Sequence, residues 1–291
     1  MALTLTACGS KDDDDPQEEV VTNKNANTTE ICQYADRLEF PKLKNNGHSL
    51  VIVHTTTDSY DAEGVNFCTE WDYQLQAQRW SCYQMHTTNG GWGGKWSRYD
   101  YANDPDGDGR QYPYDPDISD EYYDREDYFY SSGFDHGHIC PAADRSYSFL
   151  ADKQTFYMTN MQPQYNAFNA GLWAKLEAQV RTWAQSADII YVCKGATIDN
   201  EDYIIKRIQG KLIAPKYFFC ALLAKNSQGY KSIAFWMLNE TVDRTNDNLG
   251  NYAISVDDLE KLTGIDFFCN LPDNTEEDRE ARCDLNAWGL Q

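Results

Sequence analysis

Three blocks of residues near the middle of the chain constrain its fold more than any other feature. The first is Phe134-Asp-His-Gly-His-Ile-Cys-Pro141, the second is Asn160-Met-Gln-Pro-Gln164, and the third is Asn169-Ala-Gly-Leu-Trp-Ala-Lys-Leu-Glu177. Their spacing places a histidine, a polar metal ligand and a carboxylate in one small supersecondary unit.

The third block opens a helical pattern. Its apolar residues recur at helical spacing and predict a buried face made by Leu172, Leu176, Val180 and Trp183. A second stripe flanks this face, because four residues recur at every fourth position: Asn169, Trp173, Glu177 and Arg181. The earlier segment Thr155-Phe-Tyr-Met-Thr-Asn160 is rich in aromatic and β-branched residues and predicts a strand. The expected order is therefore strand, strand, helix.

His138 is the candidate for proton transfer in this unit. It follows a glycine where an extended segment ends, and its reference pKa near neutrality suits a general base. A purely structural histidine is the simpler interpretation. A zinc site is a third, because His136, His138 and Cys140 share one face of a strand, and imidazole and thiolate groups suit that ion.

The polar helix stripe also has simpler interpretations. Asn169 suits the N-cap of a helix. Glu177 and Arg181 are spaced for an i,i+4 surface ion pair, which contributes only about 0.2–0.5 kcal/mol. Trp173 fits a role in packing alone. None of these residues indicates a function when it is considered by itself.

Taken in order, the blocks resemble the DNA/RNA non-specific endonuclease family, whose core is the ββα-metal (His-Me finger) motif. The family pattern Asp-Arg-Gly-His-x-x-Pro matches the first block, except that His136 replaces the arginine. The pattern Asn-x-x-Pro-Gln, followed by Asn, Trp and Glu on a helix, matches the other two blocks at Asn160, Pro163, Gln164, Asn169, Trp173 and Glu177. Two later stretches also fit, Ile213-Ala-Pro-Lys-Tyr217 and the segment from Ser255 to Phe268, so the resemblance covers roughly residues 36 to 272.

The resemblance implies phosphodiester hydrolysis assisted by one metal ion. His138 would deprotonate the attacking water, Asn169 would hold a hydrated Mg²⁺ for which Mn²⁺ can substitute, and Glu177 would orient the waters of the ion. Arg98 lies near the place of a phosphate-binding arginine of the family and joins His138 and Glu177 as a catalytic candidate. The implied substrate contacts are His136, Asn160, Trp173 and Arg181. Because His136 stands where the family has arginine, it can attract a phosphate only when protonated.

The function implied is a sugar-non-specific endonuclease that acts on DNA and RNA. The alternative is a surface nucleic-acid-binding lipoprotein of the same fold with impaired catalysis, which His136 and the formal net charge of −21 favour. The acids and bases between Ser131 and Ala184 balance, however, so the excess acid lies outside the candidate site. A small phosphodiester is a third possible substrate. No protein partner is inferred.

The first thirty residues are expected to lie outside the fold. Leu5-Thr-Ala-Cys8 resembles the cleavage box of bacterial lipoproteins, in which Cys8 would carry the lipid, and an acidic run follows it. Residues 1–30 are therefore interpreted as a lipoprotein-like signal remnant with a disordered acidic tether, and residues 31–291 as the endonuclease domain. Only seven residues precede Cys8, fewer than a working signal needs, and a plain polar tail is the alternative.

This interpretation predicts export, either to the outer membrane or cell surface of a Gram-negative bacterium or as a secreted protein. The chain has no run of eighteen apolar residues, so membrane contact is expected through the N-terminal lipid only. Eight cysteines remain besides Cys8, an even number that allows four disulfides in an oxidising compartment. The pairs Cys68–Cys82 and Cys269–Cys283 are favoured, whereas Cys193 and Cys220 also suit buried free thiols.

The acidic segment after Arg98 predicts a structural calcium site. Asp104, Asp106 and Asp108 alternate, and Gly109 stands at the sixth place, as in the first half of a calcium-binding loop. The twelfth place is Asp115 instead of glutamate. A solvated acidic loop without an ion is the alternative.

The remaining pattern predicts an α+β fold with a mixed or antiparallel sheet and packed helices. Apolar and β-branched runs predict strands at residues 48–56, 71–76, 79–86, 189–193, 217–223 and 232–238, with a glycine-rich turn at residues 89–94. Ser255 and Asp258 predict a capped helix that carries Leu259 and Leu262.

Overall fold

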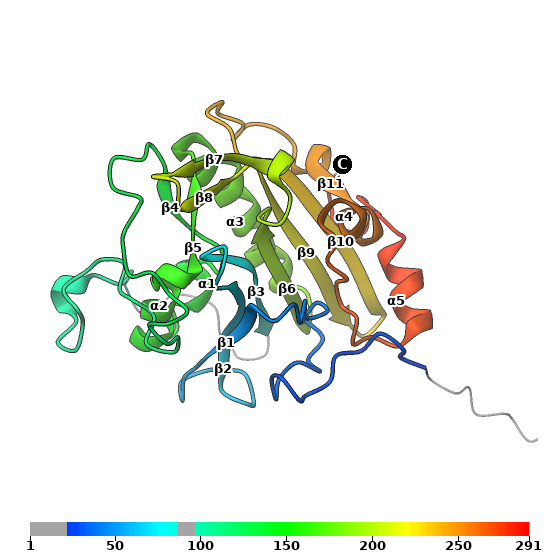
Figure 1. The fold of residues 1–291 in the computed structure, drawn as a ribbon. Coiled ribbons are helices and arrows are strands. Elements are labelled where there is room, and N and C mark those ends of the chain that lie inside the picture. The colour runs from blue at the N-terminus through cyan, green and yellow to red at the C-terminus, as the bar shows by residue number, and fades with distance from the viewer. Residues whose placement is uncertain (1–21, 87–96, 291) are drawn as a thin grey trace, which may run out of the picture.

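A seven-stranded antiparallel sheet forms the centre of the computed structural model, which describes residues 22 to 86 and 97 to 290. Its strands lie in the order β1, β2, β3, β6, β9, β10, β11 (Figure 1). They span Ser49–Thr55 (β1), Val65–Asp72 (β2), Ala77–His86 (β3), Ile189–Ala196 (β6), Tyr217–Asn226 (β9), Gly229–Leu238 (β10) and Ala253–Ile254 (β11). Two strand pairs lie outside this sheet: β4 (Asp135–His138) with β5 (Met161–Gln164), and β7 (Ile204–Ile208) with β8 (Leu212–Pro215).

Within residues 22–86 and 97–290, five α-helices accompany the sheets. They are α1 (Ala142–Arg145), α2 (Phe149–Thr155), α3 (Ala174–Ala184), α4 (Val256–Thr263) and α5 (Asp273–Glu280). A π-helical turn, η3 (Phe168–Trp173), leads directly into α3, and short 3₁₀ turns span Tyr101–Asn103 (η1), Met158–Asn160 (η2), Glu201–Tyr203 (η4) and Leu249–Tyr252 (η5). Within the described residues, no helix is long and apolar enough to cross a membrane.

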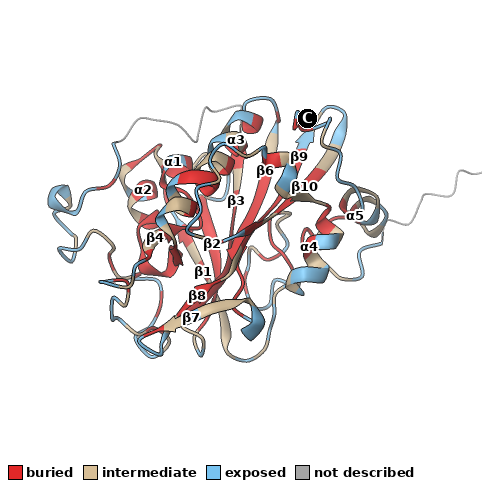
Figure 2. Cartoon of the chain, turned by 90° about the horizontal axis from the view of Figure 1, so that it is seen from above, coloured by how far each residue is buried: buried red, intermediate tan, exposed pale blue. Residues whose placement is uncertain are grey.

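Helices α3 and α4 cover opposite faces of the large sheet (Figure 1). Alternate residues of a strand point to opposite faces. Accordingly, Ile190 and Val192 of β6 join the core beneath α3, and Tyr191 and Cys193 join the core beneath α4. Figure 2 shows the central strands largely buried, with the exposed residues mainly in loops, on outer helix faces and at strand ends. The sheet therefore separates two apolar cores.

Most strands lie at the positions predicted from the sequence, with two corrections. The strand expected at residues 71–76 ends at Asp72 instead, because the Asp72 carboxylate accepts hydrogen bonds from the backbone N–H groups of Gln74 and Leu75 and closes a turn. The strand expected from Thr155 to Asn160 is the end of helix α2 and a 3₁₀ turn. Ser148 caps α2 by accepting a bond from the Ala151 N–H group, and the actual strand is β5.

The predicted cap of helix α4 is confirmed. Ser255 Oγ accepts a hydrogen bond from the Asp258 N–H group at 3.1 Å, and Gly264 ends the helix in the left-handed region. The glycine-rich stretch at residues 89–94 and Cys8 both lie outside the described residues.

The cysteines of the described chain are free thiols. Cys68 and Cys82 face each other across β2 and β3, and Cys193 lies opposite Cys82 on β6. Seven of the eight thiols are buried, whereas Cys283 is exposed. The predicted Cys68–Cys82 and Cys269–Cys283 disulfides are therefore not formed here, and the free-thiol interpretation of Cys193 and Cys220 describes the observed state.

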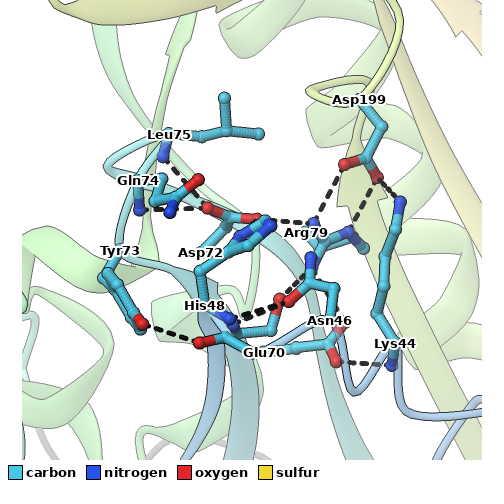
Figure 3. A network of polar contacts seen from close by, with 12 residues as sticks. Lys44, Asn46, His48, Glu70, Asp72, Tyr73, Gln74, Leu75, Arg79 and Asp199 are labelled. Carbon is cyan, nitrogen blue, oxygen red and sulfur yellow. Dashed lines mark hydrogen bonds and ion pairs between the residues drawn. The ribbon is translucent and has the colours of Figure 1, made fainter.

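A buried arginine joins three parts of the fold, as Figure 3 shows. Arg79 on β3 is 1% exposed, and its guanidinium group donates hydrogen bonds to Glu70 at 3.1 Å, to Asp72 at 2.9 Å and to Asp199 at 2.7 Å. Lys44 Nζ also lies 3.0 Å from Asp199. Because these partners come from β2 and from the loop after β6, the network fixes the edge of the sheet to its middle.

Candidate active site

A cleft of about 460 Å³ gathers most of the predicted site residues. It lies where β4, the start of α1 and the η3–α3 segment meet. Five predicted site residues line the cleft: Arg98, His136, His138, Asn169 and Glu177. Two further polar residues that had no predicted role, Tyr112 and Asp135, also line it. The order strand, strand, helix is observed as β4, β5 and the η3–α3 helix, but the second strand is Met161–Gln164 and not the predicted segment Thr155–Asn160.

The β4–β5 pair positions His138 through close backbone contact. His138 pairs with Met161, and Asp135 pairs with Gln164 in the antiparallel register. A Cβ atom on Gly137 would lie 2.3 Å from the side chain of Gln164. Only glycine fits this position, which explains the glycine between the two histidines of the first block.

His138 is a buried histidine with one ring nitrogen left unpartnered. The residue is 9% exposed, and its Nε2 atom has no hydrogen-bond partner. The edge of Phe156 packs against the imidazole, with ring centroids 4.7 Å apart. Burial, followed by the charges of Arg98 and His136, lowers the pKa of His138 from 6.5 to about 3. The imidazole is therefore neutral near pH 7, so the ring has a nitrogen lone pair that is able to accept a proton.

Asn169 lies in the π-helical turn and is anchored by the first strand of the unit. Its Nδ2 group donates a hydrogen bond to Asp135 Oδ2 at 3.0 Å, and Asn166 Nδ2 donates to the same oxygen at 2.9 Å. The N-cap of η3 is Ala167, so Asn169 does not serve as the helix cap. Since Nδ2 faces Asp135, the amide oxygen is the atom that can bind a cation.

Glu177 lies one helical turn into α3, with a buried lysine near its carboxylate. Lys194 on β6 is fully buried, and its Nζ lies 3.5 Å from Glu177 Oε1 and 4.9 Å from the centre of the Trp173 ring. Burial raises the pKa of Glu177, and the charge of Lys194 opposes that rise. The side chain of Glu177 is 15% exposed. Its accessible edge therefore faces the cleft while Lys194 supports the carboxylate from the core side.

His136 is held in an aromatic stack. Its ring lies parallel to Tyr112, with centroids 3.8 Å apart, and also stacks on Phe129 at 4.1 Å. Its Nε2 atom is 3.3 Å from Asp127 Oδ1, and this hydrogen bond is the main cause of the lowered pKa of Asp127. The position at which the family carries arginine is thus occupied by a ring with partners on both faces and at one nitrogen.

Arg98 is exposed and lies at the edge of the cleft. Its guanidinium carbon is 4.7 Å from the centre of the Phe156 ring, the same ring that contacts His138. The next residue is fixed, because the Tyr99 N–H group donates to Asp152 Oδ2 at 2.6 Å. A cation is therefore placed close to the candidate base.

The other three predicted substrate contacts do not line the cleft. Asn160 is fully buried, and its side chain hydrogen-bonds the backbone of Cys140 and Thr155. Trp173 is 1% exposed and donates from Nε1 to the His138 carbonyl oxygen at 3.4 Å. Arg181 pairs with Asp144 at 2.8 Å instead of with Glu177. Against expectation, Asn160 and Trp173 are placed as supports of the His138 strand and not as substrate contacts.

The other predicted metal sites are not assembled. Within the described part of the chain, potential ligands converge in threes at two other places, and neither includes the zinc candidates His136, His138 and Cys140. Cys140 is buried in the core beneath α3, and its N–H group donates to Asn160. The zinc interpretation therefore does not fit the structure.

The aspartates of the predicted calcium loop do not converge among the described residues either. Asp104 forms an ion pair with Lys153 at 2.6 Å and accepts a bond from Tyr99 Oη. Asp115 is buried and accepts hydrogen bonds from His54 Nε2 at 2.9 Å and from Thr159. These bonds connect the acidic segment to the fold without requiring an ion.

One of the two converging groups consists of His54, Asp115 and Asp117. None of these residues lines the cleft that contains His138. The stacking of His54 on Phe67, with ring centroids 4.3 Å apart, and its bond to Asp115 account for its position in the core. This group is therefore distinct from the candidate active site.

Three residues of the site were not recognised in the sequence. Asp135 stood in the matched block but received no role, although it anchors Asn169. Tyr112 lies in the acidic segment and stacks on His136. Lys194 was detectable as a single lysine inside the apolar run from Ile189 to Ala196, since a buried lysine requires a partner.

Comparison with known proteins agrees with this arrangement. The family model described as DNA/RNA non-specific endonuclease matches residues 49–274. Nuclease C1 of Cunninghamella echinulata var. echinulata is 31% identical over 179 residues, which cover 58% of this chain and 71% of that protein. A nuclease of Nostoc sp. is 33% identical, covering 53% of this chain and 57% of that protein, and human mitochondrial Endonuclease G is 30% identical, covering 57% and 59%. The chain thus spans less than two thirds of the length of the latter two relatives.

A solved structure has a similar fold. The structure titled "Crystal structure of the EndoG/EndoGI complex: Mechanism of EndoG inhibition" includes a chain that superimposes with a TM-score of 0.60 at 19% identity, covering 75% of this chain and 86% of that one. The match of the family model extends from β1 into α5. It includes every residue that lines the cleft, since these residues all lie between positions 98 and 177. The chain belongs to the DNA/RNA non-specific endonuclease family.

Proposed function

We propose that the chain is a metal-dependent endonuclease that hydrolyses phosphodiester bonds in both DNA and RNA. The observation that carries this proposal is the cleft itself, which the imidazole of His138 lines together with Asn169, Glu177 and Arg98. A base in its neutral form near pH 7 is the group that water activation requires.

The neutral imidazole of His138 would take a proton from the attacking water. Phe156 restricts the orientation of the ring, and the Trp173 bond to the His138 carbonyl oxygen restricts its backbone. Arg98 supplies positive charge for the phosphate at the edge of the cleft. We assign the phosphate contact to Arg98 in preference to His136, because Tyr112, Phe129 and Asp127 already hold His136.

The residues of the cleft fit a hard divalent ion. Asn169 offers an amide oxygen, and Glu177 offers a carboxylate edge that would hydrogen-bond the waters of the ion. Mg²⁺ prefers oxygen ligands and keeps several of its waters, which agrees with a site of few protein ligands, and Mn²⁺ suits the same groups. When bound, such an ion neutralises charge on the phosphate and on the leaving oxygen.

The proposed activity on both DNA and RNA rests on contacts with phosphate and not with the bases. The cleft presents charged and polar groups suited to phosphate, and phosphate contacts carry no sequence information. The relatives are named as nucleases and as Endonuclease G, which supports a nucleic-acid substrate. With a chain charge of −21, affinity is expected to be modest and to fall as salt rises.

The test is cleavage of plasmid DNA and of a long RNA by the purified chain, with Mg²⁺, with Mn²⁺ and with EDTA. We expect both polymers to be cut at internal positions in the presence of either ion, and neither to be cut in EDTA. Intact substrates under every ion would refute catalysis and favour the binding-only alternative. Cleavage of small phosphodiesters alone would refute the polymeric substrate.

We also propose that the chain is exported as a surface lipoprotein through Cys8. The support is the sequence Leu5-Thr-Ala-Cys8 and the acidic run that follows it. With a complete lipoprotein signal segment placed ahead of Leu5, expression in a Gram-negative host with radiolabelled palmitate should label the wild type in the membrane fraction and leave Cys8→Ser unlabelled. Equal labelling of the two proteins would contradict the assignment.

A further inference from the structure

A second cleft lies on the opposite face of the large sheet, between α4, α5 and the N-terminal segment. It encloses about 560 Å³, and seven carboxylate side chains, two lysines and Asn25 line it. Both lysines have partners, because Lys24 lies 3.7 Å from Asp273 and Lys261 donates to Asp258 at 2.7 Å. Negative charge in this cleft is therefore poorly compensated by the chain itself.

Three carboxylates converge at the floor of the cleft. Oxygen atoms of Asp257 and Glu260 on α4 and of Glu280 on α5 all lie within 4.8 Å of one another. Two oxygens on opposite sides of a Ca²⁺ ion, each at about 2.4 Å, would lie about 4.8 Å apart. The spacing thus matches a set of ligands that share one ion.

Glu280 is the residue that distinguishes this site from an ordinary acidic surface. It is only 4% exposed, and its Oε1 atom is buried without a hydrogen-bond partner. An unpaired carboxylate in such a place is costly unless a cation or a proton compensates it. Burial, together with the nearby charges of Glu260 and Glu276, raises the pKa of Glu280 to about 10.

Asn25 brings a fourth oxygen to the same cleft. Its Nδ2 group donates to Asp266 Oδ2 at 3.1 Å and to Glu276 Oε1 at 3.0 Å. These bonds orient the amide, and its Oδ1 atom is buried without a partner. Amide oxygens are common ligands of calcium.

We propose that Asp257, Glu260 and Glu280, with Asn25 beside them, form a binding site for a hard divalent cation, best suited to Ca²⁺. All the available ligands are oxygen atoms, which disfavours softer ions such as zinc. The number and spread of the ligands suit the flexible coordination of Ca²⁺ better than the strict octahedron of Mg²⁺. The bound ion would join the N-terminal segment to α4 and α5.

The test is the thermal unfolding of the full chain, freed of metal by a chelator, over a series of Ca²⁺ concentrations. We expect the unfolding temperature to rise until the site is saturated, because an ion that binds only the folded state stabilises it. Glu280→Gln keeps the shape of the side chain and should weaken the apparent affinity for Ca²⁺ by about tenfold or more. Without calcium this variant should be no less stable than the wild type, since the uncharged amide keeps the shape of the side chain and Oε1 has no partner to lose.

Two controls separate this site from the other cleft. Asn169→Ala should keep the full response to Ca²⁺, and so should Asp278→Asn, which removes a partly exposed carboxylate of α5 that pairs with Arg282. Should Glu280→Gln fail to fold, Asp257→Asn must lose the response in its place. The proposal would be overturned if Glu280→Gln and Asp257→Asn both kept the full response to Ca²⁺, or if the wild type showed no response to Ca²⁺. Either result would show that protons, and not a cation, compensate these carboxyl groups.

Discussion

Arg79 and His138 are both buried titratable side chains, yet their surroundings differ in one respect. The guanidinium group of Arg79 donates to Ser49, Glu70, Asp72 and Asp199, so the charge is surrounded by partners. Beside the cleft, by contrast, the buried His138 Nε2 has no hydrogen-bond partner. Leaving a buried polar atom unpaired costs about 1–3 kcal/mol. The difference indicates that the Arg79 network serves the fold, whereas His138 is held neutral beside the cleft without a partner for its buried nitrogen.

The largest effect that would sharpen this comparison is expected from His138→Ala. Loss of the general base should lower the rate of plasmid cleavage about 10²- to 10⁴-fold, because the other imidazole that lines the cleft, His136, is held by Tyr112, Phe129 and Asp127. Circular dichroism would verify that the variant is folded. A wild-type rate from the folded variant would refute the assignment of the base.

Arg79→Met should lower the stability of the fold and leave the cleavage rate unchanged. It leaves Glu70, Asp72 and Asp199 without their cation, and breaking a buried ion pair in this way costs about 3–5 kcal/mol. The free energy of unfolding in urea should fall by that amount, while the cleavage rate per folded molecule stays unchanged. Arg282→Met is the matched control, because this exposed arginine pairs with Asp278 and should contribute less than about 1 kcal/mol. A loss of activity in folded Arg79→Met would break the division between the two regions.

The pH dependence of stability offers a third test. The pKa of His138 is about 3 in the folded protein and 6.5 ordinarily, so the unfolded chain binds more protons between these values. Stability must then fall as pH decreases from 6.5 towards 3. His138→Asn should remove this contribution, so its loss of stability between pH 7 and pH 4 should be smaller than that of the wild type by about 3 kcal/mol. Parallel stability curves for the two proteins would show that His138 is not held neutral by burial.

The smallest expected effect concerns two tryptophans near α3. Trp173→Phe removes the donor to the His138 carbonyl oxygen, and Trp183→Phe removes a donor to the Trp288 carbonyl oxygen at 2.8 Å. Each should lower the free energy of unfolding by about 1 kcal/mol. Only Trp173→Phe should also slow cleavage, by less than about tenfold, because only its partner belongs to the catalytic strand. Equal rates in the two variants would show that the bond to His138 does not position the base.

Much of the catalytic unit was predictable because its chemistry is local. The periodicity around Leu176 and Glu177 predicted the helix, and the blocks around His138 and Asn169 predicted the cleft that joins them. The strand expected at Thr155 was wrong because a capping bond from Ser148 outweighs the β propensity of the aromatic residues. Local hydrogen bonds of this kind leave little trace in hydrophobic periodicity.

The parts that were not predictable depend on contacts between distant segments. Lys194 meets Glu177 only because β6 lies beneath α3, and Tyr112 meets His136 only because the acidic segment folds over β4. The burial of Trp173 and Asn160 likewise follows from the packing of whole elements. Sequence spacing identifies which residues carry the chemistry, but not which of them the solvent reaches.

The attachment of the N-terminal segment has a practical consequence. Thr22 and Lys24 both hydrogen-bond to Asp273 at the start of α5, and α5 packs on the face of the sheet that α3 does not cover. A fusion partner or a solid support joined close to Thr22 would therefore lie beside α5, away from β4 (Figure 1). Immobilising the protein through this end should leave the cleft open to long polymers, whereas coupling through the exposed residues near Arg98 should obstruct it.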